Sequence, residues 1–193
     1  MLKKKRLRAD CHRRDGNREY DYQQCGSGCC LEVDSFLGNG ERAGLDSNGL
    51  LKKISVIRRG IMLRRPDPKD GIDILSKVGG LDLAGLAGVF LGGALCRVPM
   101  LIDGFISGAA ALMAQRICSL SSGYMLASHV SSEPAGELIL RELGCRPAIA
   151  AGMCLGEGTG AVAVMPLLDM ALRIYREMST FHEIEIEEYR PLS

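Results

Sequence analysis

A carboxylate between two glycines is the group in this sequence that is best placed for catalysis or ligand binding. Glu157 lies between Gly156 and Gly158, and Thr159 follows. The glycines allow the backbone to approach a ligand closely, and the apolar helix expected after them offers unpaired N–H groups to an anion such as phosphate. Glu157 is therefore a candidate general base. The alternative interpretation is an ordinary turn that carries an exposed acid.

Two other polar segments follow short apolar runs that are typical of buried strands. Asp103 comes directly after one run, and Ser131 comes shortly after the other. Ligands of doubly wound sheets bind at the carboxyl ends of the strands, which makes both residues candidate ligand contacts. The alternative is that Ser131 or Ser132 caps the helix that Pro134 opens. We interpret His129 as a structural histidine.

Alternating helices and strands must position these residues. The segment from Glu183 to Glu187 alternates Glu and Ile, which suits an edge strand or a disordered tail. The order of elements is typical of an α/β fold with a doubly wound, mostly parallel sheet and flanking helices. Helices are expected over residues 49–63, 70–78, 81–95, 106–117, 133–143 and 161–178, and strands over 98–102 and 123–127.

The composition excludes several classes of protein. The chain has 193 residues, of which 47% are hydrophobic and 24% charged, and its net charge is +1. These values suit one soluble globular domain and not a disordered or nucleic-acid-coating chain. Charged residues interrupt the most apolar stretch before it is long enough to cross a bilayer, and no secretory signal is evident. We therefore expect a cytoplasmic protein with no nucleic-acid or membrane partner.

The first 42 residues differ from the rest of the chain. They are rich in charged residues and glycine, they lack apolar periodicity, and they hold four of the eight cysteines. A structural zinc site needs paired ligands at short spacing, and this segment offers one Cys-His dipeptide and one adjacent Cys pair, so we expect no metal and no cofactor. The residues concerned are Cys11, His12, Cys25, Cys29 and Cys30.

Five segments resemble, in the same order, one enzyme family. From about residue 43 to 180 the chain resembles the C-terminal part of nicotinate-nucleotide:dimethylbenzimidazole phosphoribosyltransferase, and residues 181–193 form a tail. The stretches Asp-Gly-Phe-Ile-Ser-Gly and Gly-Glu-Gly-Thr-Gly are specific enough to name the family. The five segments are Gly44-Leu45-Asp46 with Lys53, Lys77-Val78-Gly79-Gly80, Ile102 to Ala110, Ser128 to Pro134, and Leu155 to Gly160.

The resemblance implies a reaction and a set of site residues. The family displaces nicotinate from nicotinate mononucleotide by a nitrogen of dimethylbenzimidazole, which gives α-ribazole 5′-phosphate for the lower ligand of cobalamin. Glu157 would be the catalytic base, and no metal or cofactor is required. Because the family dimerises, a homodimer is possible. The residues implied or expected to bind substrate are Lys53, Ser131, Gly156, Gly158, Thr159 and Asp103.

The chain also departs from the family. A full-length member has a long N-terminal portion and a Gly-Glu-Met-Gly-Ile-Gly-Asn-Thr-Thr phosphate loop ahead of the position of Lys53. Here the segment from Asp15 to Cys25 stands instead, and codons exist for it whose adjacent frame reads Met-Gly-Ile-Gly-Asn-Thr-Thr. We therefore interpret residues 1–42 as an out-of-frame or disordered segment. The expected protein is then a truncated, incomplete copy of the family fold that lacks part of both substrate sites.

Three functional hypotheses follow from the sequence. The first is this truncated phosphoribosyltransferase, whose activity alone is in doubt. The second is a non-catalytic nucleotide-binding remnant, which binds nicotinate mononucleotide without turning it over. The third is a small metal-binding protein, which requires zinc to be lost when Cys29 and Cys30 are mutated.

Overall fold

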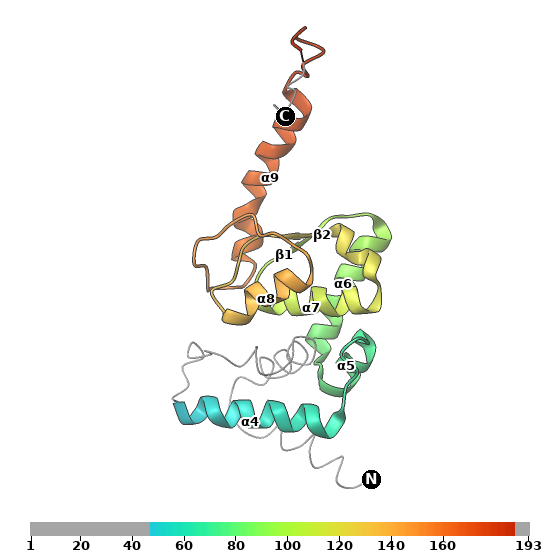
Figure 1. Ribbon diagram of the computed structural model, residues 1–193, viewed down its shortest axis with the longest axis vertical. Helices are drawn as coiled ribbons and strands as arrows, with labels where there is room; N and C mark the ends of the chain where they lie inside the picture. The colour runs from blue at the N-terminus through green and yellow to red at the C-terminus, as the bar shows by residue number, and fades with distance from the viewer. Residues whose placement is uncertain (1–46, 188–193) are drawn as a thin grey trace, which may run out of the picture.

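The computed structural model describes residues 47–187, in which helices surround a small parallel sheet (Figure 1). The order of helices and strands predicted for this part is confirmed, with boundaries that shift by a few residues. The predictions for residues 1–42, including the out-of-frame segment and its cysteines, lie outside the described residues. The elements are α4 (Ser47–Arg64), α5 (Gly71–Val78), α6 (Leu81–Cys96), β1 (Met100–Ile102), α7 (Phe105–Ile117), η2 (Ser119–Tyr124), β2 (Met125–Ala127), α8 (Pro134–Glu142) and α9 (Thr159–Glu177).

The sheet places three carboxyl ends at one edge. β1 and β2 pair in parallel along their full length. A third extended segment continues beside β2, because the amide of Ala148 donates to the carbonyl of Ala127 at 3.1 Å. Further on, Ile149 forms an isolated parallel bridge with His129. The predicted α/β class with a parallel sheet is confirmed, and the loops that follow all three segments meet at the same end.

Helix α7 lies at the centre of the core. Its residues from Ala109 to Ala114 are fully buried, and α5, α6 and α8 pack around it (Figure 1). Small residues permit this close packing: a Cβ on Gly71 of α5 would lie 2.6 Å from the Met113 carbonyl oxygen of α7. Leu112 is among the largest fully buried side chains, and burial of one such residue contributes about 1.5–3 kcal/mol. Helix α7 therefore supports β1, the strand that it contacts, from the side of the core.

A polar cluster closes the turn between α4 and α5. Asp70 caps α5 by accepting the amides of Ile72 and Asp73, as its position before the helix predicts. The Asp73 carboxylate bonds the Lys77 ammonium at 2.7 Å and accepts the amide of Asp67, also at 2.7 Å. The bonds from Lys77 and Asp67 lower the pKa of Asp73.

Local backbone chemistry explains where the boundaries differ from expectation. β1 begins at Met100 because Arg97 ends α6 in the left-handed conformation and Pro99 has no N–H for the ladder. β2 begins only at Met125 because η2 occupies the preceding residues. Of the two alternatives for the segment near the C-terminus, the edge strand is wrong as far as Glu187, since the chain there forms turns.

Helix α9 leaves the body of the molecule (Figure 1). Two of its residues, Gly160 and Val164, are buried where it starts, and from Met165 onward its side chains are largely exposed. Within residues 47–187 no helix combines the length and the apolar character needed to cross a bilayer. The exposed apolar side chains of α9 are Val162, Met165, Leu167, Met170, Leu172, Ile174 and Tyr175.

Candidate functional site

The loop around Glu157 has an unusual backbone. Gly156, Glu157 and Gly158 have φ values of 75°, 55° and 81°, so three successive residues are left-handed. Glycine accepts this conformation freely, whereas a residue with a Cβ pays about 1–2 kcal/mol for it. Thr159 closes the turn, since its amide and its hydroxyl donate to the Gly156 carbonyl at 3.1 Å and 2.7 Å. The turn places Glu157 at its apex.

The Glu157 side chain is exposed. Among the residues that the structure describes, its carboxylate makes no hydrogen bond and no ion pair. Strained residues that are not glycine gather at functional sites, where the surrounding structure holds them in place. A carboxylate presented in this way is free to accept a proton from a ligand.

Asp103 connects the end of β1 to this loop. One carboxylate oxygen, Oδ2, accepts the amide of Gly158 at 3.0 Å, and the other, Oδ1, accepts the amide of Ala161 at 2.9 Å. Gly158 is the N-cap position of α9 and has no side chain to cap the helix. Asp103 therefore supplies the cap from a distant part of the chain, where the helix dipole favours a negative charge.

Ser128 and His129 form the buried floor beneath the start of α9. The Ser128 hydroxyl lies 2.7 Å from the Ile102 carbonyl oxygen, 3.1 Å from that of Asp103 and 3.1 Å from Nδ1 of His129. A Cβ on Gly160 would lie 1.8 Å from the same Nδ1 atom, so residue 160 must be glycine for α9 to pack on the imidazole. The buried position of His129 agrees with its predicted structural role.

Serine, histidine and aspartate here do not form a hydrolytic triad. The Ser128 hydroxyl is fully buried and directed at main-chain carbonyls, and both Asp103 oxygens accept backbone amides. A triad requires an exposed nucleophile and a carboxylate that orients the histidine. These side chains therefore hold the backbone, and the group exposed for chemistry is Glu157.

Ser131 lies on the neighbouring loop. Its Oγ accepts the amide of Glu133 at 3.2 Å, and the next residue, Ser132, donates its amide to the Met153 carbonyl at 3.1 Å. The second bond places the loop beside the chain that leads to Glu157. Helix α8 has Glu133 at its N-cap position with no side-chain cap of its own, and the Ser131 hydroxyl binds the amide of that N-cap residue, one residue before the helix.

Lys53 is placed apart from the other predicted site residues. It belongs to α4, and its side chain lies outside the described part of the structure. In Figure 1, α4 is separated from β1 and β2 by the layer that contains α7. The structure thus brings Asp103 together with Gly158 and sets Ser131 near them, but it does not bring α4 to this edge of the sheet.

Sequence reasoning did not identify Gly160 and Ser128 as residues that build the site. A signal for Gly160 was present, because glycines at 156, 158 and 160 alternate through the loop. The first and second glycines have positive φ values, and the third has a normal φ and permits close packing. The role of Ser128 depends on contacts across the sheet, which a one-dimensional pattern does not show.

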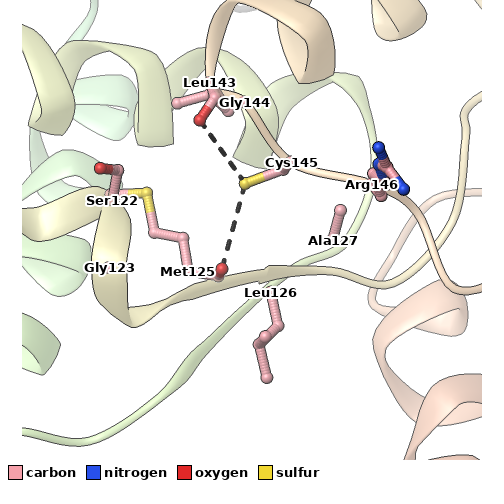
Figure 2. A pocket seen from close by; sticks show the side chains of 9 residues that line it. All are labelled: Ser122, Gly123, Met125, Leu126, Ala127, Leu143, Gly144, Cys145 and Arg146. Atoms are coloured by element: carbon pink, nitrogen blue, oxygen red, sulfur yellow. Dashed lines mark hydrogen bonds between the residues drawn. The ribbon is translucent and has the colours of Figure 1, made fainter. Parts of the chain in front are cut away.

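A separate hollow of about 330 Å³ lies along β2 and the chain that follows α8, and Glu157 does not line it. Figure 2 shows the Cys145 thiol between two main-chain carbonyls, and its Sγ lies 4.0 Å from the Met125 oxygen and 3.8 Å from the Leu143 oxygen. Burial raises the pKa of this thiol. None of the predicted site residues lines the hollow. Within residues 47–187 no cluster of three or more His, Cys, Asp or Glu side chains is arranged to hold a metal ion.

The sequence is similar to a set of curated enzymes. Nicotinate-nucleotide--dimethylbenzimidazole phosphoribosyltransferase of Desulforamulus reducens is 48% identical over 158 residues, which are 82% of this chain and 44% of that protein. The enzyme of the same name from Clostridium acetobutylicum is 46% identical over 166 residues, which are 86% of this chain and 46% of that protein. The chain thus spans less than half the length of these relatives.

The fold is similar to a solved structure of the same kind. The crystal structure of CobT from Thermus thermophilus superimposes with a TM-score of 0.78 at 32% identity, over 89% of this chain and 51% of that one. A family model described as phosphoribosyltransferase matches residues 27–186, so the match begins within the N-terminal segment that the sequence sets apart. It covers most of the chain, and the chain therefore belongs to the nicotinate-nucleotide:dimethylbenzimidazole phosphoribosyltransferase family.

Proposed function

We propose that this chain carries the catalytic-base part of a nicotinate-nucleotide:dimethylbenzimidazole phosphoribosyltransferase site, with Glu157 as the base. The observation that carries the proposal is the exposed Glu157 carboxylate, which has no partner among residues 47–187 and is held on a strained turn at the carboxyl edge of the sheet. A general base must reach a proton on the substrate, and a carboxylate already paired within the protein is poorly suited to that role. The names of the relatives supply the substrates.

The proposed reaction is a displacement at C1′ of nicotinate mononucleotide. A ring nitrogen of dimethylbenzimidazole forms the new bond to C1′ with inversion, and the bond from C1′ to the nicotinate nitrogen breaks. The electron pair of that bond leaves with nicotinate and neutralises its ring charge. Glu157 takes the proton from the other benzimidazole nitrogen. The protein mainly has to align two rings and accept one proton, and this alignment lowers the barrier.

The substrate phosphate would be held beside the loop. Ser131 accepts one amide and, within the described residues, donates its hydroxyl proton to no other group, so this proton can bond a phosphate oxygen. The amides of Gly158 and Thr159 are already bonded within the protein, so the predicted contacts of the loop with substrate depend on close approach of its backbone. A role for Lys53 in binding the phosphate would require α4 to approach the loop, and this approach, the cytoplasmic location and the homodimer remain parts of the same proposal.

The test is production of α-ribazole 5′-phosphate from nicotinate mononucleotide and dimethylbenzimidazole by the purified full chain. Glu157→Gln keeps the size of the side chain but cannot accept the proton, so the rate should fall by about 10²–10⁴-fold. Glu177→Gln, an exposed residue at the other end of α9, is the matched control and should leave the rate unchanged. Equal rates for the wild type and Glu157→Gln would exclude Glu157 as the base.

A binding protein without turnover is the second candidate function. The chain covers 44% and 46% of the two relatives compared above, so the activity of the whole enzyme is not carried over to it. Isothermal titration with nicotinate mononucleotide separates the two functions. Binding with no product supports the remnant, and binding with product that depends on Glu157 supports the enzyme.

A further inference from the structure

We propose that Asp103 is the positioning residue for the Glu157 carboxylate, and that it acts through the backbone without touching substrate. This inference rests on the proposed role of Glu157. It differs from the expectation drawn from the sequence, in which Asp103 at a strand end contacts the ligand. The contacts that carry the inference join the end of β1 to the loop and to the first turn of α9.

The two carboxylate oxygens of Asp103 accept amides from just before and just inside the start of α9. Oδ2 accepts the amide of Gly158, the residue next to Glu157, and Oδ1 accepts the amide of Ala161 in the first helical turn. Both bonds are of normal length, and each joins a charged acceptor to a backbone donor. The carboxylate therefore fixes where the loop ends and where the helix begins.

Thr159 closes the loop through its two bonds to the Gly156 carbonyl, but these bonds lie within the loop and do not tie it to the sheet. Gly156 and Gly158 have the widest backbone freedom of any residue type, and a Cβ on either would meet no other atom within 4 Å. Glu157 itself lies in a conformation that it would leave if released. Without the Asp103 bonds, the Glu157 carboxylate would sample many positions, and a displacement of about 1 Å is enough to cost about 100-fold in rate.

The Asp103 residue is itself held in place. The Ser128 hydroxyl lies 3.1 Å from the Asp103 carbonyl oxygen and contacts His129, which lies against Gly160. A Cβ on Gly160 would also meet Asp103 Oδ1 at 2.9 Å, so the helix start, the carboxylate and the imidazole share one tightly packed space. Asp103 thus transmits the position of the sheet to the loop.

The experiment compares Asp103→Ala and Asp103→Asn with the wild-type full chain. Asparagine keeps one acceptor oxygen, and alanine keeps none. The protection of the loop amides and the kcat should therefore be highest in the wild type, lower in Asp103→Asn and lowest in Asp103→Ala. Asp169→Asn is the matched control, because Asp169 is an exposed residue of α9, the helix whose start Asp103 holds. Circular dichroism and thermal melting check that each variant folds.

The first readout does not require activity. Amide hydrogen exchange at Gly158 and Ala161 should be faster by about tenfold or more in Asp103→Ala, because each loses a bond to a charged acceptor, while exchange in α7 stays unchanged. Unchanged exchange at both amides would overturn the proposal. If the wild-type chain shows no turnover, the proposed function fails but this readout still decides whether Asp103 fixes the loop.

The second readout separates positioning from substrate contact. A positioning residue should lower kcat and leave the KM for nicotinate mononucleotide unchanged. Asp103→Ala should also cause little further loss when added to Glu157→Gln, since both act through one carboxylate. A raised KM at unchanged kcat would instead assign Asp103 to substrate binding and would overturn the proposal.

Discussion

Replacing Glu157 with glycine should stabilise the protein while removing the proposed base. Glu157 has φ 55°, and relief of the left-handed strain is worth about 1–2 kcal/mol. Glycine adds about 0.5–1 kcal/mol of backbone entropy to the unfolded chain, which opposes this gain. The side chain makes no hydrogen bond or ion pair that would be lost within the described residues. The net expectation is a gain of about 0.5–1 kcal/mol in the free energy of unfolding.

Urea denaturation of the full chain measures this gain. Glu157→Ala is the matched control, because it removes the carboxylate but keeps the Cβ that causes the strain, and its stability should stay within about 0.5 kcal/mol of wild type. Arg173→Gly, at an exposed mid-helix position of α9, should lower stability by about 0.5–1 kcal/mol. The reasoning is refuted if Glu157→Gly is no more stable than Glu157→Ala.

Three further predictions concern packing and titration. Gly160→Ala should lower the melting temperature and reduce the free energy of unfolding by about 1–3 kcal/mol, because its Cβ would overlap His129. Gly85→Ala is the control and should not destabilise the protein, since a Cβ there meets nothing within 4 Å. Equal effects of the two changes would contradict the packing argument. Lys77 lowers the folded-state pKa of Asp73, so this stabilisation is present above the unfolded pKa and is lost as pH falls through the folded value. In Asp73→Asn the free energy of unfolding should therefore fall less steeply as the pH is lowered into the acid range. An unchanged slope would contradict the proposed contribution of Asp73. Because burial raises the pKa of Cys145, iodoacetamide should label it more slowly at neutral pH than the exposed Cys118, as followed by mass spectrometry.

The order of elements was predictable because local chemistry determines much of it. Asp70 caps α5, Gly144 follows α8 with a left-handed backbone, and short apolar runs mark β1 and β2. The start of β1 and the helix η2 were not predicted. An arginine in the left-handed conformation at position 97 is uncommon, and the short helix η2 has no apolar periodicity that a sequence window would reveal.

The candidate base was predictable, but the way it is held was not. Glycines on both sides of Glu157 mark it in the sequence. The bonds from Asp103 to Gly158 and Ala161 span 55 and 58 residues, and the packing of Gly160 on His129 is likewise distant in sequence. Such contacts exist only after the sheet has formed. Sequence position therefore indicated that Asp103 is near the site and could not indicate which atoms it bonds.

The exposed apolar face of α9 also sets the thermal behaviour of the chain. Side chains such as Met170, Ile174 and Tyr175 are exposed in the described structure of the single chain, so unfolding of that chain exposes little new apolar surface along this helix. The heat capacity of unfolding scales with newly exposed apolar surface and is about 12–15 cal/mol/K per residue in ordinary domains. For this chain it should fall below that range, and calorimetry should show a stability curve that is flatter with temperature.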